Sequence, residues 1–300
     1  MKTGNKTRNL VAYGSNLNCA ELKRKYHINL GKPLAKVYLP DRRLSFSSYS
    51  FGRRGGVLDV PPAVGSCVEA TLFQVGEREY EVIRAKEGSR YVEREGWVYA
   101  DMGVRYWANY FEVRPEYREA FVRPTDNYLS IVRWGYEHYD LGTPVLADAA
   151  EGKSGQRQLP LFVYGTLMRG EIRHEFLAPF LGKGLTACEM WGKLQTNGSF
   201  PMLVDDPKRR SLVPGEAGLL DNPEKAFAVL DRIEGARSHS ETSPGFYRTP
   251  VFIATQERGR VHHAWCYVWW GDLPSGVKPV KSNDWRQVSR PVWDAFEVTH

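Results

Sequence analysis

Two short phrases of the sequence combine a glycine turn with a hydroxyl side chain, and both could bind a negatively charged group. Residues 11–17 read Val-Ala-Tyr-Gly-Ser-Asn-Leu, and residues 161–167 read Leu-Phe-Val-Tyr-Gly-Thr-Leu. A chain that turns at glycine and presents consecutive backbone N–H groups forms a concave anion site. Ser15 or Thr166 adds a hydroxyl donor, so each turn could hold a carboxylate or the oxyanion of an attacked carbonyl.

A glutamate followed by glycine comes about 70 residues after each phrase, as Glu87 in the first half and Glu234 in the second. A carboxylate can act as a general acid–base catalyst once burial raises its pKa from the usual value near 4.3. A lone Tyr-Gly-Ser turn or a lone Glu-Gly pair is most often structural. Because both signals recur in the same order and at similar spacing, the sequence predicts a duplicated domain that carries its site twice.

The length and composition of the chain agree with two domains. The 300 residues exceed one typical domain, and the 42% hydrophobic content is enough for two buried cores. Residues 148–158 are small, polar and glycine-bearing, as expected for a linker. We therefore expect a first domain at residues 1–147 and a second domain at residues 159–300.

The pattern of apolar residues predicts many strands and few helices in both halves. A helix is expected at residues 77–86 and another at 223–232, so that each Glu-Gly pair ends a helix; a further helix is expected at 127–136. Strands are expected at 39–49, 67–73, 104–113, 215–220, 246–254 and 262–270. This order suggests a mixed sheet or a small barrel in each half and argues against repeated βαβ units.

Several classes of protein are disfavoured by the composition. The net charge of +6 is spread over dispersed basic clusters, which argues against nucleic-acid binding. No apolar stretch approaches the roughly 18 residues needed to span a membrane, and no secretory signal is evident. The four cysteines are far apart, and His262 and His263 would point to opposite faces of a strand. We therefore expect a cytoplasmic protein with reduced thiols and no metal.

The two halves resemble the γ-glutamylcyclotransferase family, also described as AIG2-like or BtrG-like. The resemblance rests on Tyr-Gly-Ser-Asn-Leu at 13–17 and Tyr-Gly-Thr-Leu at 164–167, each with its downstream Glu-Gly. The first half is similar to a longer form of the family with a tyrosine-bearing late helix. The second half is similar to a shorter form, with Leu-Asp-Arg-Ile-Glu-Gly at 230–235. The resemblance implies an α+β fold of two tandem small mixed β-barrels with flanking helices.

The resemblance also implies a reaction. Members of the family cleave a γ-glutamyl amide, a small molecule, by attack of its own α-amine on the γ-carbonyl, which releases 5-oxoproline and a free amine without a cofactor. Glu87 and Glu234 are the implied catalytic residues. The implied substrate-binding residues are those of the two turns together with one tyrosine of the late helix: Tyr13, Gly14, Ser15, Asn16, Leu17, Tyr128, Tyr164, Gly165, Thr166 and Leu167.

The first half departs from the family pattern before its glutamate. Ala85 and Lys86 precede Glu87, whereas the second half has the Leu-Asp-x-x-Glu-Gly arrangement. Two alternatives to a tandem cyclotransferase stay open. One or both halves could be non-catalytic binding or scaffold domains, or a glutamate could activate water in an amide hydrolase.

Overall fold

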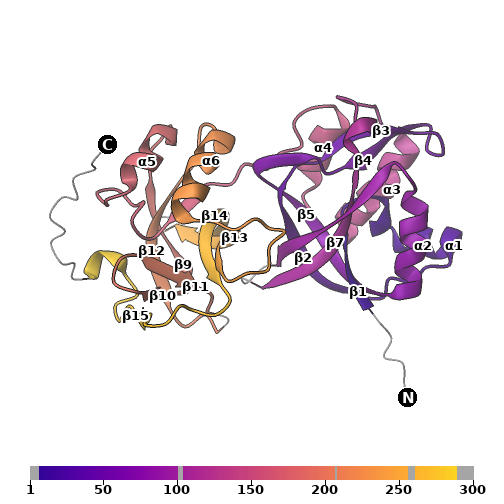
Figure 1. Ribbon diagram of the computed structural model, residues 1–300. Helices are drawn as coiled ribbons and strands as arrows, with labels where there is room; N and C mark the ends of the chain where they lie inside the picture. Colours follow the sequence, from indigo (N-terminus) through magenta and orange to yellow (C-terminus); the bar gives the residue numbers. More distant parts are fainter. Residues whose placement is uncertain (1–6, 101–103, 207, 256–260, 289–300) are drawn as a thin grey trace, which may run out of the picture. The chain divides into compact units, whose positions relative to one another are not determined.

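The computed structural model contains strands curled into barrels, with helices beside them (Figure 1). It describes residues 7–100, 104–206, 208–255 and 261–288, with 255, 261 and 262 described by their backbone alone. Contacts between residues divide the chain into two compact units. The first comprises Met1–Leu159 with Ser238–Thr242, and the second comprises Pro160–Arg237 with Ser243–His300.

The first unit is built on a closed barrel of five strands with the order β1-β5-β2-β6-β7. Its neighbouring strands pair antiparallel except at the closing seam, where β1 runs parallel to β7 through Leu10 and Asn109. The barrel strands are β1 (Thr7–Ala12), β2 (Pro33–Arg42), β5 (Pro62–Gly76), β6 (Tyr91–Ala100) and β7 (Arg105–Val113).

The second unit repeats this barrel with the same connectivity. Its strands follow the order β8-β12-β9-β13-β14, and its seam is again parallel, through Leu161 of β8 and Trp265 of β14. The strands are β8 (Leu161–Val163), β9 (Thr186–Trp191), β12 (Leu212–Gly218), β13 (Gly245–Thr255) and β14 (Val261–Trp270). The predicted α+β fold of two tandem mixed barrels with flanking helices is thus confirmed.

Each barrel carries a small additional sheet between equivalent strands. In the first unit, β3 (Ser45–Ser50) pairs with β4 (Gly55–Asp59) between β2 and β5. In the second unit, β10 and β11 form a hairpin between β9 and β12, and β15 pairs with β10. These strands are β10 (Lys193–Thr196), β11 (Pro201–Val204) and β15 (Lys278–Pro279).

The one strand expected at 39–49 is instead two. The chain leaves the barrel after Arg42, and β3 begins at Ser45. Asp41 adopts a left-handed backbone conformation (φ 53°), and the pairing of β2 with β5 shifts register between Pro40 and Arg42. A register shift of this kind bends a strand. The alternation of apolar and polar residues therefore continues along 39–49, although the chain passes from the barrel into the small β3-β4 sheet.

A single helix follows the fifth sequential strand of each unit's sheets and ends at the Glu-Gly pair. In the first unit this is α2 (Glu77–Glu87), and Gly88 caps it with a positive φ of 70°. In the second unit it is α6 (Pro223–Glu234), which Asn222 caps at the N-terminus and Gly235 ends in the left-handed conformation. Glycine at this position terminates a helix without the steric cost that a side chain would add.

The remaining helices of the described residues are short, apart from α3 (Asp126–His138), where the side chain of Thr125 accepts a hydrogen bond from the Tyr128 N–H. The others are α1 (Cys19–Tyr26), α4 (Thr143–Ala150) and α5 (His174–Leu177), with 3₁₀ turns η1 (Ser15–Leu17), η3 (Pro115–Tyr117), η4 (Ala178–Phe180) and η5 (Trp285–Gln287). The last three residues of α4 overlap the segment expected as a linker.

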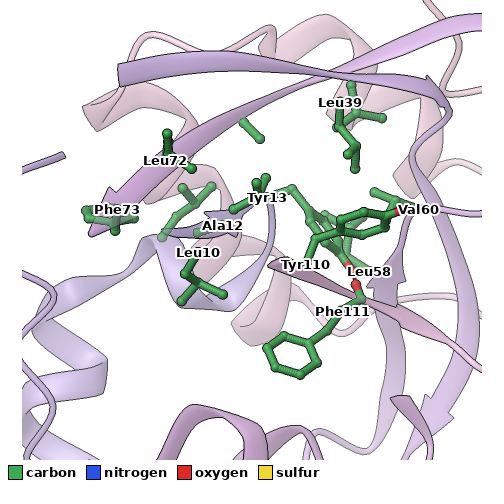
Figure 2. Close-up of a cluster of buried hydrophobic side chains, with 14 of the residues drawn as sticks. Leu10, Ala12, Tyr13, Leu39, Leu58, Val60, Leu72, Phe73, Tyr110 and Phe111 are labelled. Carbon is green, nitrogen blue, oxygen red and sulfur yellow. Dashed lines mark hydrogen bonds between the residues drawn. The ribbon is translucent and has the colours of Figure 1, made fainter. Parts of the chain in front are cut away.

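The interior of the first barrel is filled by apolar side chains from its strands and from β4. Figure 2 shows Leu10 and Ala12 of β1 with Leu72 of β5 and Leu58 of β4 in this cluster. Phe111 of β7 is 5% exposed and packs at its edge. Burial of one such leucine or phenylalanine side chain stabilises the fold by about 1.5–3 kcal/mol, so the core holds β1, and the turn that follows it, in place.

Helix α3 packs directly against the turn at a glycine. A Cβ atom built on Gly135 would lie 2.3 Å from the Cβ of Leu17, which is fully buried. Contacts this short do not occur between real Cβ atoms, and the Leu17 Cβ cannot rotate away because it is fixed to the backbone. The absence of a side chain at Gly135 therefore sets the distance between α3 and η1.

We expect Gly135→Ala to destabilise the first unit. Glycine to alanine within an exposed helix normally stabilises by about 1 kcal/mol, but overpacking of a core costs about 1–3 kcal/mol, so the net change is unfavourable. Urea denaturation of the full chain, followed by circular dichroism, measures the free energy of unfolding. Gly52→Ala is the control, because no atom lies within 4 Å of its added Cβ. An unchanged or higher stability of Gly135→Ala would contradict this packing.

Candidate active site

Both units turn at the motif glycine into a short 3₁₀ turn directly after the first barrel strand. In the first unit, the Leu17 N–H donates to the Gly14 carbonyl at 2.9 Å. In the second unit, the Met168 N–H donates to the Gly165 carbonyl at 3.0 Å. The two turns therefore share this first hydrogen bond, with Met168 in the place of Leu17.

Each turn leaves two consecutive backbone donors unused. Within the described part of the chain, the N–H groups of Ser15 and Asn16 have no acceptor, and neither have those of Thr166 and Leu167. All four residues line a cavity beside their turn. Consecutive N–H groups of this kind can bind an anion or stabilise an oxyanion.

The motif tyrosines hold the turns against the barrel seam. The Tyr13 hydroxyl donates a hydrogen bond to the Phe111 carbonyl on β7. The Tyr164 hydroxyl donates to the Tyr267 carbonyl on β14 at 2.8 Å and accepts from the Leu203 N–H at 3.2 Å. Burial raises the pKa of both tyrosines well above 10, so both are neutral. Both tyrosines line their cavities, and their hydroxyl groups form hydrogen bonds that hold the turns against the barrels.

Glu87 lies at the end of α2, at the mouth of the first turn. Its Oε1 accepts a hydrogen bond from Asn16 Nδ2 at 2.9 Å and an ion-paired hydrogen bond from Lys86 Nζ at 3.0 Å. Lys86 Nζ also donates to Asn16 Oδ1 at 2.9 Å. Only 12% of the Glu87 side chain is exposed, so the carboxylate is shielded from solvent and its charge is matched by a neighbouring cation.

Glu234 lies at the end of α6 and has a different environment. Its Oε1 is buried without a hydrogen-bond partner, and the nearest cation is Arg173, with Nη1 at 3.7 Å. Burial raises the pKa of Glu234, and Arg173 partly offsets that rise. The carboxyl is therefore biased toward binding a proton.

The contrast between the two glutamates follows from two positions that differ between the repeats. The turn places Asn16 where the second unit has Leu167, and the helix places Lys86 where the second unit has Ile233. The first unit thus gives its glutamate an amide and an ammonium group, and the second gives aliphatic side chains. Both carboxylates nevertheless line the cavity beside their own turn.

Tyr128 of α3 reaches the first site from the side opposite the helix end. Its hydroxyl accepts a hydrogen bond from the Leu58 N–H at 3.4 Å, and the Arg53 guanidinium lies over its ring, 5.3 Å from the centroid. Burial raises the pKa of Tyr128 to about 12, so its hydroxyl stays neutral. The tyrosine predicted from the late helix does line the cavity.

The cavities of the two sites differ in size and in lining. The first unit has a cavity of about 30 Å³ at the turn and an adjoining one of about 330 Å³, and Ser15, Glu87, Tyr91 and Tyr128 line both. The cavity of the second unit is about 20 Å³ and is lined largely by aromatic and aliphatic side chains. The first site is thus open and polar, and the second is narrow and apolar.

The structure brings together the predicted residues of each site, with one exception. Tyr13, Gly14, Ser15, Asn16, Glu87 and Tyr128 line the cavity of the first unit, and Tyr164, Gly165, Thr166, Leu167 and Glu234 line that of the second. Leu17 does not join them, because its side chain is fully buried against Gly135. Leu17 therefore anchors the turn and does not face the cavity.

Several residues around the two sites were not anticipated from the sequence, among them Tyr91, Lys86, Arg173 and Tyr267. Tyr91 donates its hydroxyl to the Leu58 carbonyl at 3.0 Å and lines both cavities of the first unit. Lys86 and Arg173 supply the cations next to the two glutamates. Tyr267 lines the second cavity. Of these, only Lys86 had a local signal, because it precedes Glu87 directly.

The described residues contain neither a cluster of metal-ligating side chains nor a helix that could span a membrane. No group of three or more histidine, cysteine, aspartate or glutamate side chains lies close enough together to hold a metal ion. None of the helices in that part of the chain has the length and hydropathy to cross a membrane. His262, half of the histidine pair weighed as a metal ligand, has its side chain outside the described residues.

Two barrels of one connectivity, each with a glycine turn and a shielded glutamate at its cavity, define a tandem-repeat protein. Residues 161–287 match the family described as gamma-glutamyl cyclotransferase, AIG2-like. The chain therefore carries a domain of that family in its second unit, which confirms the family predicted from the motifs. The first unit has the same barrel connectivity, so the predicted tandem arrangement is confirmed as well.

Solved structures similar to this chain include a protein named gamma-glutamyl cyclotransferase, at 18% identity and a TM-score of 0.43, covering 48% of this chain and 86% of that one. An AIG2-like protein from Mus musculus matches at 22% identity and a TM-score of 0.29, and the match covers 37% of this chain and 76% of that protein. YkqA from Bacillus subtilis matches at 13% identity and a TM-score of 0.34, and the match covers 88% of this chain and 84% of that protein. No curated protein sequence matches the chain.

The two motif glycines are predicted to differ in their tolerance of a side chain. A Cβ on Gly165 would lie 2.4 Å from Pro201 Cγ, whereas a Cβ on Gly14 would meet nothing closer than 3.7 Å. We expect Gly165→Ala to displace β11 from the turn and to lower the stability of the second unit by about 1–3 kcal/mol. Gly14→Ala is the matched control and should change the stability by less than about 0.5 kcal/mol. Equal midpoints in urea for the two variants would show that the turn does not touch β11 as described.

Proposed function

We propose that the chain is a γ-glutamyl cyclotransferase, which converts a γ-glutamyl amide into 5-oxoproline and a free amine. One observation carries the proposal. In each barrel, the glutamate that ends the helix lines the same cavity as two consecutive unused N–H groups. A base next to an oxyanion site is what an internal acyl transfer requires. The family match of the second unit supports this chemistry.

The proposed reaction needs only one proton carrier. One proton of the substrate α-ammonium group is first released to solvent. As the resulting α-amine attacks the γ-carbonyl to close a five-membered ring, the glutamate takes a second proton from the same nitrogen. The carbonyl electrons move to oxygen, where the backbone N–H groups stabilise the negative charge. When the carbonyl re-forms, the bond to the departing amine breaks and the glutamate returns the proton to that nitrogen. No water is consumed, and the intramolecular attack benefits from effective molarities of about 10⁵ M or more.

Glu234 suits this role because its buried Oε1 has no hydrogen-bond partner. Burial raises the pKa of its carboxyl. The carboxylate therefore binds a proton more readily, and its pKa moves toward those of the two nitrogen atoms between which it carries the proton. Arg173, at 3.7 Å, keeps the deprotonated form accessible. The second barrel is therefore the stronger candidate for the chemical step.

Glu87, unlike Glu234, has two polar partners that hold its carboxylate. Its carboxylate is already engaged by the ion pair with Lys86 and by the hydrogen bond from Asn16. This pairing favours a second function for the first barrel, in which it binds a γ-glutamyl compound without converting it. Substitution of each glutamate separates the two roles.

Replacement of the glutamates by glutamine tests the proposal. We expect Glu234→Gln to lower 5-oxoproline formation by the second barrel by about 10²–10⁴-fold, because the general acid–base group is lost while the shape is kept. Glu87→Gln reports the contribution of the first barrel in the same way. Mass spectrometry of the products from a panel of γ-glutamyl amines gives the measurement.

The control for this experiment is Glu224→Gln, an exposed residue at the opposite end of α6, which should leave product formation unchanged. Full activity of the variant that lacks both glutamates would disprove their catalytic role. Release of free glutamate in place of 5-oxoproline would identify the chain as a hydrolase.

The raised pKa of Glu234 also predicts a trade-off between activity and stability. Because the folded state holds the Glu234 proton more tightly than the unfolded chain, whose pKa is near 4.5, the carboxyl favours folding at low pH. That contribution is lost as the pH rises from about 4.5 through the folded pKa. Glu234→Gln, which cannot ionise, should therefore gain stability relative to the wild type as the pH rises. Thermal unfolding between pH 4 and pH 8 measures this difference, and a constant difference over that range would contradict it.

A further inference from the structure

The large cavity of the first unit is the feature that the proposed reaction does not yet explain. It has a volume of about 330 Å³ and adjoins the small cavity at the glycine turn. Ser15, Glu87, Tyr91 and Tyr128 belong to both. A γ-glutamyl group held at the turn would therefore direct the rest of its molecule into this larger cavity, which we call the outer chamber.

The outer chamber is lined by four cations from separate segments. Lys25 comes from α1, Arg53 from the loop between β3 and β4, Lys86 from α2, and Arg90 from the segment that precedes β6. Tyrosine side chains lie between them. A lining of this kind offers hydrogen-bond donors and positive charge from several directions, which suits separated carboxylates better than one compact anion.

The charges of the chamber do not balance. Glu21 pairs with Arg53, at 3.0 Å, and with Lys25, while Glu87 pairs with Lys86. Arg90 makes no ion pair within the described part of the chain, and its guanidinium lies over the rings of Phe51 and Tyr117. Four cations therefore face two carboxylates, which leaves an excess of two positive charges.

The second unit provides a comparison inside the same chain. At its turn the cavity is lined by Phe200, Pro201 and Leu167, and its volume is about 20 Å³. Lys86 is replaced there by Ile233. The positive chamber is thus a property of the first repeat alone among the described cavities at the two turns, although the barrel and the turn are shared.

We propose that the outer chamber is the leaving-group subsite of the first barrel, and that it selects γ-glutamyl compounds whose released amine carries two carboxylates, as an acidic amino acid does. This inference rests on the proposed function, because it assumes that the γ-glutamyl group binds at the turn. Two carboxylates match the excess of two positive charges. Arg90 is the specificity-determining residue, since it is the one cation of the chamber that forms no ion pair within the described residues.

The test uses the full chain carrying Glu234→Gln, so that the second barrel contributes little 5-oxoproline. γ-Glutamyl-glutamate, γ-glutamyl-glutamine and γ-glutamyl-ethylamide release amines with two, one and no carboxylates. Isothermal titration calorimetry gives their dissociation constants, and 5-oxoproline formation gives kcat/KM. We expect γ-glutamyl-glutamate to be preferred over γ-glutamyl-glutamine by about tenfold or more, and the preference to shrink at 0.5 M salt because salt screens charges.

Arg90→Gln should reduce that preference by about tenfold in binding. Arg78→Gln is the matched control, because Arg78 is exposed on α2 and does not line the chamber, and it should preserve the preference. Preferential binding of γ-glutamyl-glutamate without turnover would uphold the subsite while refuting catalysis by the first barrel. Equal binding of the three compounds, no binding of any, or an unchanged preference in Arg90→Gln would overturn the inference.

Discussion

The structure depends on the hydrogen bond by which a tyrosine hydroxyl joins the first strand of each barrel to the last. Tyr13 bonds the Phe111 carbonyl and Tyr164 bonds the Tyr267 carbonyl, in each case next to the parallel seam that closes the barrel. The following glycine then turns the chain across the end of the barrel. Because the seam fixes the tyrosine, it also positions the two N–H groups of the second and third residues after it, and the end of the helix brings one carboxylate to the same cavity.

The two repeats show how one scaffold sets two different electrostatic environments. The barrel, the turn and the helix stop are shared, so the glutamate reaches the same place twice. Asn16 and Lys86 then surround one carboxylate with polar groups, while the second repeat has Leu167 and Ile233 in their places. The resulting difference in hydrogen bonding and ion pairing comes from neighbours in the turn and the helix, and not from any change in barrel connectivity.

The sequence predicted most of the fold and both glutamates because these features have local causes. Helix stops at glycine and alternating strand patterns depend on neighbouring residues, and the repeat doubled the signal. The strand expected at 39–49 was wrong because the left-handed Asp41 and a register shift, which binary patterning does not encode, divide it. The buried position of Leu17, the orientation of Tyr91 and the grouping of Arg53 with Arg90 depend on contacts between distant segments. No single-sequence pattern carries such information.

The complete closure of each barrel has a consequence for a chain that contains two copies of one topology. Tandem repeats of similar structure risk misassembly during synthesis, when strands of one copy pair with the exposed edges of the other. Among the described residues, every barrel strand has a neighbour on both sides, so the barrel sheets themselves have no edge strand. A closed first barrel therefore gives the strands of the second copy no edge strand of that barrel with which to pair, which limits strand exchange between the two copies.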